Sequence, residues 1–286
     1  MEASEKSAEP AGWSRPRNIA AVEIQRLRHK LKLLRRYWFS RHRPHLPFFV
    51  LATYRSGSNL LLDYLRSLPG VQCYSEVLSP RLPIGLRRID LSPKLALKHL
   101  RYSLQSLKAP VRGCKLMLDQ LAACRLGSSD LTAAFPAARF IILYRESLAE
   151  QLLSARSARE TGQWLIRSGQ SAQQVQIEIA PLELQWFCDE TRVLYDGLLA
   201  DDRLRRASLV LSYEELVADP AGIFAKRVCP LLGLPPREPR TSMLKQNPRP
   251  LAERIINYAE IAPLLESPRC RQSYHVPQFP AGLRAA

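Results

Sequence analysis

The chain has 286 residues, of which 46% are hydrophobic and 24% are charged. This length and balance exclude an intrinsically disordered chain and favour one globular domain with a sizeable core. The formal net charge of +16 and the pI of about 10 predict an acidic partner, such as nucleic acid, an anionic membrane or a phosphorylated small molecule.

The first residues of the chain are polar. The opening segment "MEASEKSAEPAGW" lacks the apolar core of a secretory signal, and the apolar run "PFFVLA" is too short to span a bilayer. We therefore expect a cytoplasmic protein, with or without peripheral contact to a membrane.

Residues 1–46 are expected to form a basic N-terminal arm, followed by a main domain at 47–286. The first 47 residues hold eleven Lys or Arg side chains against four acids. From Asn18 to about Arg41, apolar residues recur at spacings of three and four, which predicts an amphipathic basic helix. The apolar positions are Ile24, Leu27, Leu31, Leu34 and Trp38. Three roles are open for them: docking on the body or on a partner subunit in a homo-oligomer, lying on an anionic membrane, and, least favoured, binding nucleic acid.

After the arm, short apolar runs alternate with helical patterns. The expected strands are 48–53, 71–75, 112–117, 139–144 and 208–213. The expected helices are 58–68, 92–107, 128–135, 146–161, 177–200 and 220–232. The strands are apolar enough to be buried on both faces, so the pattern predicts a three-layer α/β sandwich around a mainly parallel central sheet.

Six cysteines are scattered along the chain, without a CxxC pair or a Cys and His cluster at zinc-binding spacing. A chain of this length does not need disulfides for stability, so buried free thiols are expected. The sequence offers no paired acids typical of a magnesium site, and no metal is expected.

The turn after the first strand, "ATYRSGSN", has the composition of an anion site. Ligands of parallel sheets collect at the carboxyl ends of the strands, and a helix N-terminus offers unpaired amides and a positive dipole end. Gly57 lets the backbone approach an anion, while Ser56, Ser58 and Asn59 add donors and Arg55 adds a charge. The alternatives are an ordinary serine-capped turn, and a surface ion pair for Arg55.

The turn lacks the Walker signature GxxxxGK[ST], which needs a lysine beside the last glycine and a hydroxyl for magnesium. An NTPase is therefore disfavoured. A second arginine, Arg145, emerges from the buried strand at 139–144, which favours an anionic partner for it.

These segments resemble a known family. "ATYRSGSNLL" resembles the 5′-phosphosulfate loop of sulfotransferases that use 3′-phosphoadenosine 5′-phosphosulfate, and "FIILYRESLAEQLLSARSARETGQW" resembles their 3′-phosphate segment. The resemblance is strongest to the bacterial branch typified by trehalose 2-sulfotransferase and the nodulation-factor sulfotransferase. It covers about 48–258, and "RGCKLMLDQ" resembles the third strand of that branch.

The resemblance implies a P-loop-like sulfotransferase fold and a set of donor-binding residues. It assigns the 5′-phosphosulfate to the turn after the first strand, and the 3′-phosphate to Arg145 and Ser154. It places Tyr213, in "LSYEELVADP", near the adenine, and Lys245, in "KQNPRPLAERIINY", in a loop that closes over the 3′ side. Ser147 competes with Ser154 for the phosphate, because it lies near the start of the helix that follows Arg145.

A hydroxyl acceptor needs a base that removes its proton. Histidine is scarce, since three of the five lie in the arm and the other two match no catalytic motif. Glu76 follows the second predicted strand and so lies at the same edge of the sheet as Arg55; in the branch that the chain resembles, a Glu at this place acts as base. The alternative is an ordinary loop glutamate. Arg55 is expected to stabilise charge on the bridging oxygen, although a guanidinium cannot deliver a proton.

The sequence therefore predicts an enzyme that transfers a sulfuryl group from 3′-phosphoadenosine 5′-phosphosulfate to a hydroxyl of a carbohydrate or glycolipid. Tyr74, Trp164 and Trp186 are candidates for an aromatic platform under the acceptor, although core packing explains each of them equally well. The alternatives are a nucleotide kinase or NTPase, and a non-catalytic basic module that binds anions or membranes, including a sulfotransferase fold kept only as a scaffold.

Overall fold

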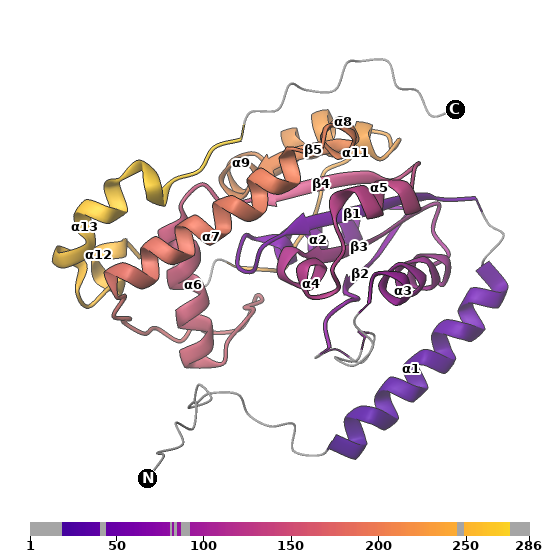
Figure 1. Ribbon diagram of the computed structural model, residues 1–286, viewed down its shortest axis with the longest axis horizontal. Coiled ribbons are helices and arrows are strands. Elements are labelled where there is room, and N and C mark those ends of the chain that lie inside the picture. Colours follow the sequence, from indigo (N-terminus) through magenta and orange to yellow (C-terminus); the bar gives the residue numbers. More distant parts are fainter. Residues whose placement is uncertain are drawn as a thin grey trace, which may run out of the picture.

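A parallel β-sheet of five strands lies at the centre of the structure (Figure 1). The computed structural model describes residues 19–40, 44–80, 82, 85–86, 92–244 and 249–274. Within them the strand order is β2-β3-β1-β4-β5, and all four neighbouring pairs run parallel. The strands are β1 (Leu46–Ala52), β2 (Val71–Glu76), β3 (Val111–Met117), β4 (Arg139–Tyr144) and β5 (Ser208–Ser212).

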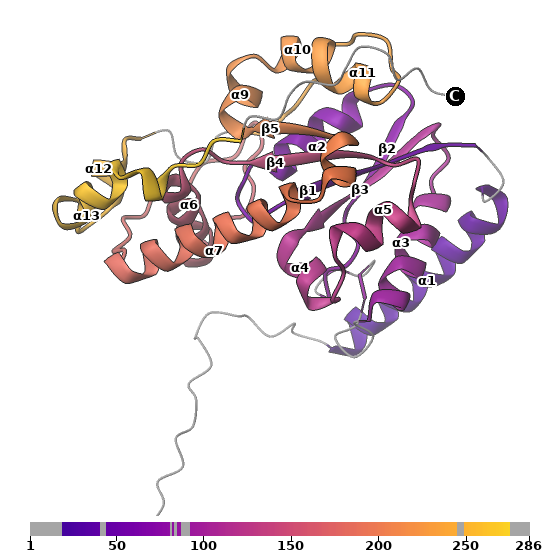
Figure 2. The ribbon, with the colours of Figure 1, turned by 45° about the horizontal axis from the view of Figure 1, so that its top comes forward.

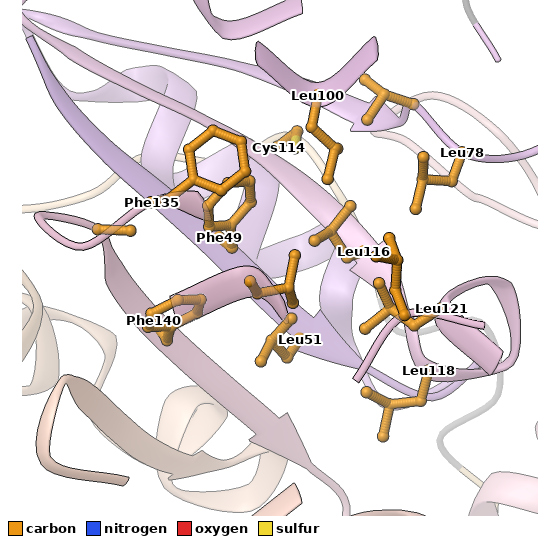
Figure 3. Close-up of a cluster of buried hydrophobic side chains, with 14 of the residues drawn as sticks. Phe49, Leu51, Leu78, Leu100, Cys114, Leu116, Leu118, Leu121, Phe135 and Phe140 are labelled. Atoms are coloured by element: carbon orange, nitrogen blue, oxygen red, sulfur yellow. The ribbon is translucent and has the colours of Figure 1, made fainter. Parts of the chain in front are cut away.

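Both faces of the sheet are covered, which explains why its central strands are apolar along almost their whole length. In β1, Phe49 and Leu51 point to one face, where they pack with Phe140 of β4 (Figure 3). The alternate residues Phe48 and Val50 point to the other face and join a second cluster. The expected three-layer α/β sandwich is confirmed.

The helices form two outer layers and a smaller third group (Figures 1 and 2). The first layer holds α3 (Pro93–Gln105), α4 (Leu118–Ala123), α5 (Ser128–Ala134), α8 (Asp202–Arg206) and the second half of α7 (Pro181–Leu199). The second layer holds α2 (Ser58–Ser67), α9 (Tyr213–Ala218), α10 (Pro220–Ile223), a π-helical turn (Phe224–Val228) and α11 (Cys229–Leu231). The third group packs the first half of α7 against α6 (Leu148–Thr161), α12 (Leu251–Arg254), α13 (Tyr258–Glu266) and a 3-10 turn (Pro268–Cys270). Among the described helices, none has the length and apolar composition needed to cross a bilayer.

All five predicted strands are present, and their bounds differ from the expected ones by at most two residues. The predicted helix 220–232 is divided into α10, the π-helical turn and α11. The predicted helix 177–200 begins later, at Pro181, because proline suits the first helical position, where no amide hydrogen is needed. The short helices α4, α8 and α9 are not predicted, because fewer than two turns carry no clear periodicity.

Helix α1 (Ile19–Ser40) forms where the apolar spacing predicts it. Its Leu33 is buried, and the ring centroid of its Tyr37 lies 4.6 Å from that of Tyr102 in α3. The apolar positions singled out in the sequence, however, are exposed to solvent: Ile24, Leu27, Leu31, Leu34 and Trp38. The alternative in which this stripe docks on the body is therefore wrong, because a different face of α1 packs on α3.

The six cysteines are buried thiols, as expected. Two of them are neighbours in the third helical group, where the Sγ atoms of Cys188 and Cys270 lie 3.5 Å apart. The remaining four lie in or beside the strands and the two outer layers, where they act as small apolar side chains.

Candidate active site

The strand order creates a crevice between β1 and β4. The chain leaves β1 toward β2 and β3, but it leaves β4 toward β5 on the other side. At such a switch point the loops beyond the carboxyl ends of the two strands diverge and open a binding site. The turn at 53–57 follows β1, and Arg145 follows β4, so both predicted anion-binding segments lie at the carboxyl ends of these two neighbouring strands.

Buried side chains form hydrogen bonds with the turn after β1. Gln151 of α6 donates its amide hydrogens to Oγ1 of Thr53 at 2.8 Å and to the carbonyl of Tyr54 at 2.6 Å. The backbone amide of Thr53 lies 3.1 Å from the hydroxyl of Tyr195, and Ser56 donates to the carbonyl of Thr53 at 2.9 Å. These bonds fix the turn before any ligand arrives.

Gly57 is the position in the turn that only glycine can fill. Its φ of +88° lies in the left-handed region, and a Cβ atom there would lie 2.3 Å from Cδ2 of Tyr213. Gly57 also precedes α2, which begins at Ser58 without a side-chain cap on its described first turn. The alternative of an ordinary serine cap is therefore wrong, and the first amides of α2 face the crevice without an intrahelical acceptor.

Arg55 is held in a partly desolvated position with a φ of 61°. Its Nε donates to Oγ of Ser154 at 3.0 Å, and its NH1 donates to the carbonyl of Trp164 at 2.7 Å. The guanidinium also lies 5.9 Å from the centroid of the Trp164 ring. Burial, followed by the charge of Arg145, lowers the pKa of Arg55 to about 10, so an anion beside it would relieve an unfavourable charge.

Arg145 is buried beside the same turn, and its guanidinium carbon lies 4.8 Å from the centroid of the Tyr213 ring. Its carboxylate neighbours are Glu150 at 3.4 Å and Glu214 at 3.8 Å, both longer than a strong ionic hydrogen bond. Arg254 holds the same oxygen of Glu150 at 2.8 Å. The Nε of Arg145 is buried and makes no hydrogen bond among the described residues, since Oε1 of Glu214 lies 3.8 Å away, so its carboxylate neighbours satisfy this guanidinium only in part.

The two candidate serines of α6 have different roles in the structure. Ser147 caps the helix, since its Oγ accepts from the amide of Glu150 at 3.2 Å. Ser154 lies about two turns further along and accepts from Arg55. Ser154 is therefore the one that contacts the anion-binding turn, while Ser147 is occupied as a cap.

Glu76 lies at the end of β2, and both of its carboxylate oxygens are bonded. Nζ of Lys115 lies 2.9 Å from one oxygen, and the amide of Gln120 donates to the other at 2.9 Å. Nζ of Lys115 also donates to Oδ1 of Asn59 at 2.7 Å. Lys115 thus links the predicted base to the anion-binding turn, and burial lowers its pKa against the opposing effect of Glu76.

Sequence reasoning assigned no role to Lys115. The signal was present, because a lysine inside the buried strand "RGCKLM" needs a polar partner. Gln151 was missed as well, since a glutamine in a helix is usually a solvated surface residue.

The other predicted site residues differ in whether they lie near the site. Lys245 lies outside the described residues. Trp164 borders the site through its contacts with Arg55, and it is exposed. Tyr74 packs against the core, with its hydroxyl 3.0 Å from Oγ of Ser106, whereas Trp186 is exposed on α7. Within the described ranges, no group of three or more His, Cys, Asp or Glu side chains is arranged to hold a metal ion.

Comparisons with known proteins identify relatives that match most of the chain. No family model matches the chain. Nodulation protein H from Rhizobium meliloti (strain 1021) is 30% identical over 232 residues, which cover 76% of this chain and 90% of that protein. Nodulation protein H from Rhizobium tropici is 27% identical over 229 residues, 75% of this chain and 87% of the relative.

A solved sulfotransferase from Alicyclobacillus acidocaldarius matches 77% of this chain and 92% of its own, with 16% identity and a TM-score of 0.44. The matches to the two nodulation proteins cover about three quarters of this chain and nearly all of the relatives' own length. The chain therefore belongs to the sulfotransferase family that includes nodulation protein H, and it is an enzyme of that class.

Proposed function

We propose that this sulfotransferase takes its sulfuryl group from 3′-phosphoadenosine 5′-phosphosulfate and passes it to a hydroxyl of a carbohydrate or glycolipid. The observation that carries the proposal is the pair of arginines, Arg55 and Arg145, which meet at one crevice from two strand ends. The charge of Arg145 helps to lower the pKa of Arg55, so the two partly desolvated cations act on each other. Such a pair favours a ligand with more than one anionic group.

The donor would lie across the crevice. Its 5′-phosphosulfate would be held by the turn after β1, through Arg55, Ser56, Gly57, Ser58 and Asn59. Its 3′-phosphate would be held by Arg145 and Ser154, and its adenine would lie beside Tyr213. Lys245, the remaining predicted donor-binding residue, lies outside the described residues. Two features support the fit: the long ion pairs of Arg145, whose neighbour Glu150 is shared with Arg254, and the amides at the start of α2.

When bound, the donor supplies an activated sulfuryl group and a nucleotide leaving group. Negative charge grows on the oxygen that separates from the sulfur, and Arg55 is a fixed cation within the turn itself. A guanidinium keeps its protons, so Arg55 stabilises this charge without protonating the leaving group. Ser154 and the carbonyl of Trp164 orient the guanidinium for that task.

Glu76 would act as the base that removes the proton of the acceptor hydroxyl. A carboxylate can do this only while it is ionised and aimed at the hydroxyl. Lys115 and Gln120 fix the orientation of the carboxylate, each through one of its two oxygens. Lys115 is therefore a positioning residue for both Glu76 and Asn59.

The acceptor proposal rests on the family and on one aromatic side chain. Trp164 is exposed at the side of the site, and flat aromatic faces are suited to stacking against sugar rings. We also place the enzyme in the cytoplasm, because six buried free thiols are typical of a reducing compartment.

The test is a transfer assay with donor that is radiolabelled in the sulfuryl group and a panel of oligosaccharides and glycolipids. Wild-type protein is compared with Glu76→Gln, and Glu238→Gln is the control because Glu238 is exposed. We expect labelled product, a loss of about 10²-fold or more in rate for Glu76→Gln, unchanged donor binding, and no effect of the control. A fully active Glu76→Gln variant would remove Glu76 from the mechanism. Transfer from ATP with magnesium in place of the sulfuryl donor would contradict the proposed donor.

A further inference from the structure

Helix α1 has two faces with different surroundings. Leu33 is 7% exposed and, with Tyr37, faces α3. The apolar side chains of another face lie in solvent, and we call them the α1 stripe: Ile24 (51% exposed), Leu27 (61%), Leu31 (59%), Leu34 (48%) and Trp38 (62%). Five large apolar groups in one line are more than the isolated exposed residues found on ordinary surfaces.

The stripe lies at the rim of the molecule. Both views show α1 on the outer side of α3, far from α6 and α12, which border the crevice (Figures 1 and 2). The stripe can therefore meet a large surface without blocking the active site.

The flanks of the stripe are basic. The helix contains six Lys or Arg residues and one acid, Glu23. Helical spacing places Arg28 and Arg35 on one side of the stripe and Lys30 on the other, and all three are exposed. Neighbouring α3 adds three further exposed cations: Lys94, Lys98 and Arg101.

We propose that α1 binds the surface of an anionic lipid bilayer, lying in the interface plane with the α1 stripe toward the acyl chains and the basic flanks at the headgroups. A helix with an apolar line, a strongly basic polar part and a tryptophan is the kind that binds in this way. Burial of the stripe supplies the apolar contribution, and the cations supply attraction to acidic headgroups. The proposal does not depend on the donor or the acceptor.

Two other partners of the α1 stripe are less compatible with the basic charges beside it. A second copy of the chain, paired through the same stripe, would bring two sets of cations together with one acid on each helix. Nucleic acid would engage the cations but would leave the apolar stripe in water.

The test is co-sedimentation of the full chain with vesicles, either of phosphatidylcholine alone or of phosphatidylcholine mixed with phosphatidylserine. The stripe variant combines Leu27→Ala, Leu31→Ala and Trp38→Ala, which keeps every charge. The flank variant combines Arg28→Gln and Arg35→Gln. The control combines Leu182→Ala and Val193→Ala, because these side chains are equally exposed on α7.

We expect wild-type protein and the control to bind only the anionic vesicles. The stripe and flank variants should each bind them about tenfold more weakly or worse, and added salt should weaken the binding of the wild type. Melting temperatures should stay the same, because the substituted side chains are exposed. Wild-type protein that stays in the supernatant, or a stripe variant that binds like wild type, would overturn the proposal. So would a wild-type dimer in sedimentation velocity that the stripe variant converts to a monomer without any vesicle binding.

Discussion

At the scale of single residues, the two arginines of the crevice have separate surroundings and so separate tasks. Arg55 belongs to the turn, where neutral oxygens of Ser154 and Trp164 orient it. Arg145 lies against Tyr213 and shares Glu150 with Arg254. In the proposed mechanism, Arg55 would stabilise the charge that develops during transfer, and Arg145 would hold a second anionic group of the ligand.

Substituting the two arginines should separate catalysis from binding. Arg55→Ala should lower kcat by about 10²-fold to 10³-fold with a smaller change in the donor Kd, because an electrostatic group of this kind acts mainly on the transition state. Arg145→Ala should instead raise the donor Kd by about tenfold or more, because a buried charged hydrogen bond is lost. Steady-state kinetics and calorimetric titration measure the two effects, with the exposed Arg237→Ala as control. Normal turnover of Arg55→Ala would contradict the role of the turn.

At the scale of elements, the junction of β1, the turn and α2 depends on close packing against the start of α9. Tyr213 of α9 occupies the space that a side chain at position 57 would need. Gln151 of α6 fixes the other side of the turn. Two elements that are distant in sequence, α6 and α9, therefore hold the turn in one conformation.

Gly57→Ala should disturb this junction. The added Cβ meets the Tyr213 ring, and the φ of +88° disfavours any L side chain, so the variant should lose about 1–3 kcal/mol of unfolding free energy. Donor affinity should fall as well, because the ring moves. Gly197→Ala is the matched control: its Cβ would meet nothing within 4 Å, and in the helix α7 alanine should be neutral or stabilising by about 0.5–1 kcal/mol. Denaturant unfolding measures both variants, and equal stabilities would show that Tyr213 does not constrain the turn.

The sequence predicts the elements better than the contacts between them. The strands are predicted because burial on both faces makes each a continuous apolar run, and the turn with Arg55 and Gly57 is predicted because its composition is unusual after a strand. Lys115 and Gln151 could not be assigned in the same way. Their partners Asn59 and Thr53 lie 56 and 98 positions away in sequence, so only the folded sheet brings them together. The face of α1 that packs on the body likewise depends on the surface of α3. The periodicity of the α1 sequence does not specify that face.

Across the whole molecule, the basic side chains behind the net charge of +16 gather in at least two separate places among the described residues. One group of cations lines the crevice between β1 and β4, where it would meet a small dianionic or trianionic ligand. Another covers α1 and the neighbouring part of α3, at the rim of the molecule (Figure 2). Charge alone fits many partners, and the geometry around each group of cations distinguishes them.

The proposed crevice site should bind a nucleotide that carries both 3′ and 5′ anionic groups. Thermal unfolding should be followed in the presence of adenosine 3′,5′-bisphosphate, 5′-AMP, and ATP with magnesium, at matched ionic strength. A ligand at a hundred times its Kd adds about 2.7 kcal/mol of stability, so the bisphosphate should raise the Tm by several degrees. We predict a clearly larger shift for the bisphosphate than for 5′-AMP, and its loss in Arg145→Ala. No shift with the bisphosphate, or a larger shift with ATP and magnesium, would contradict the account.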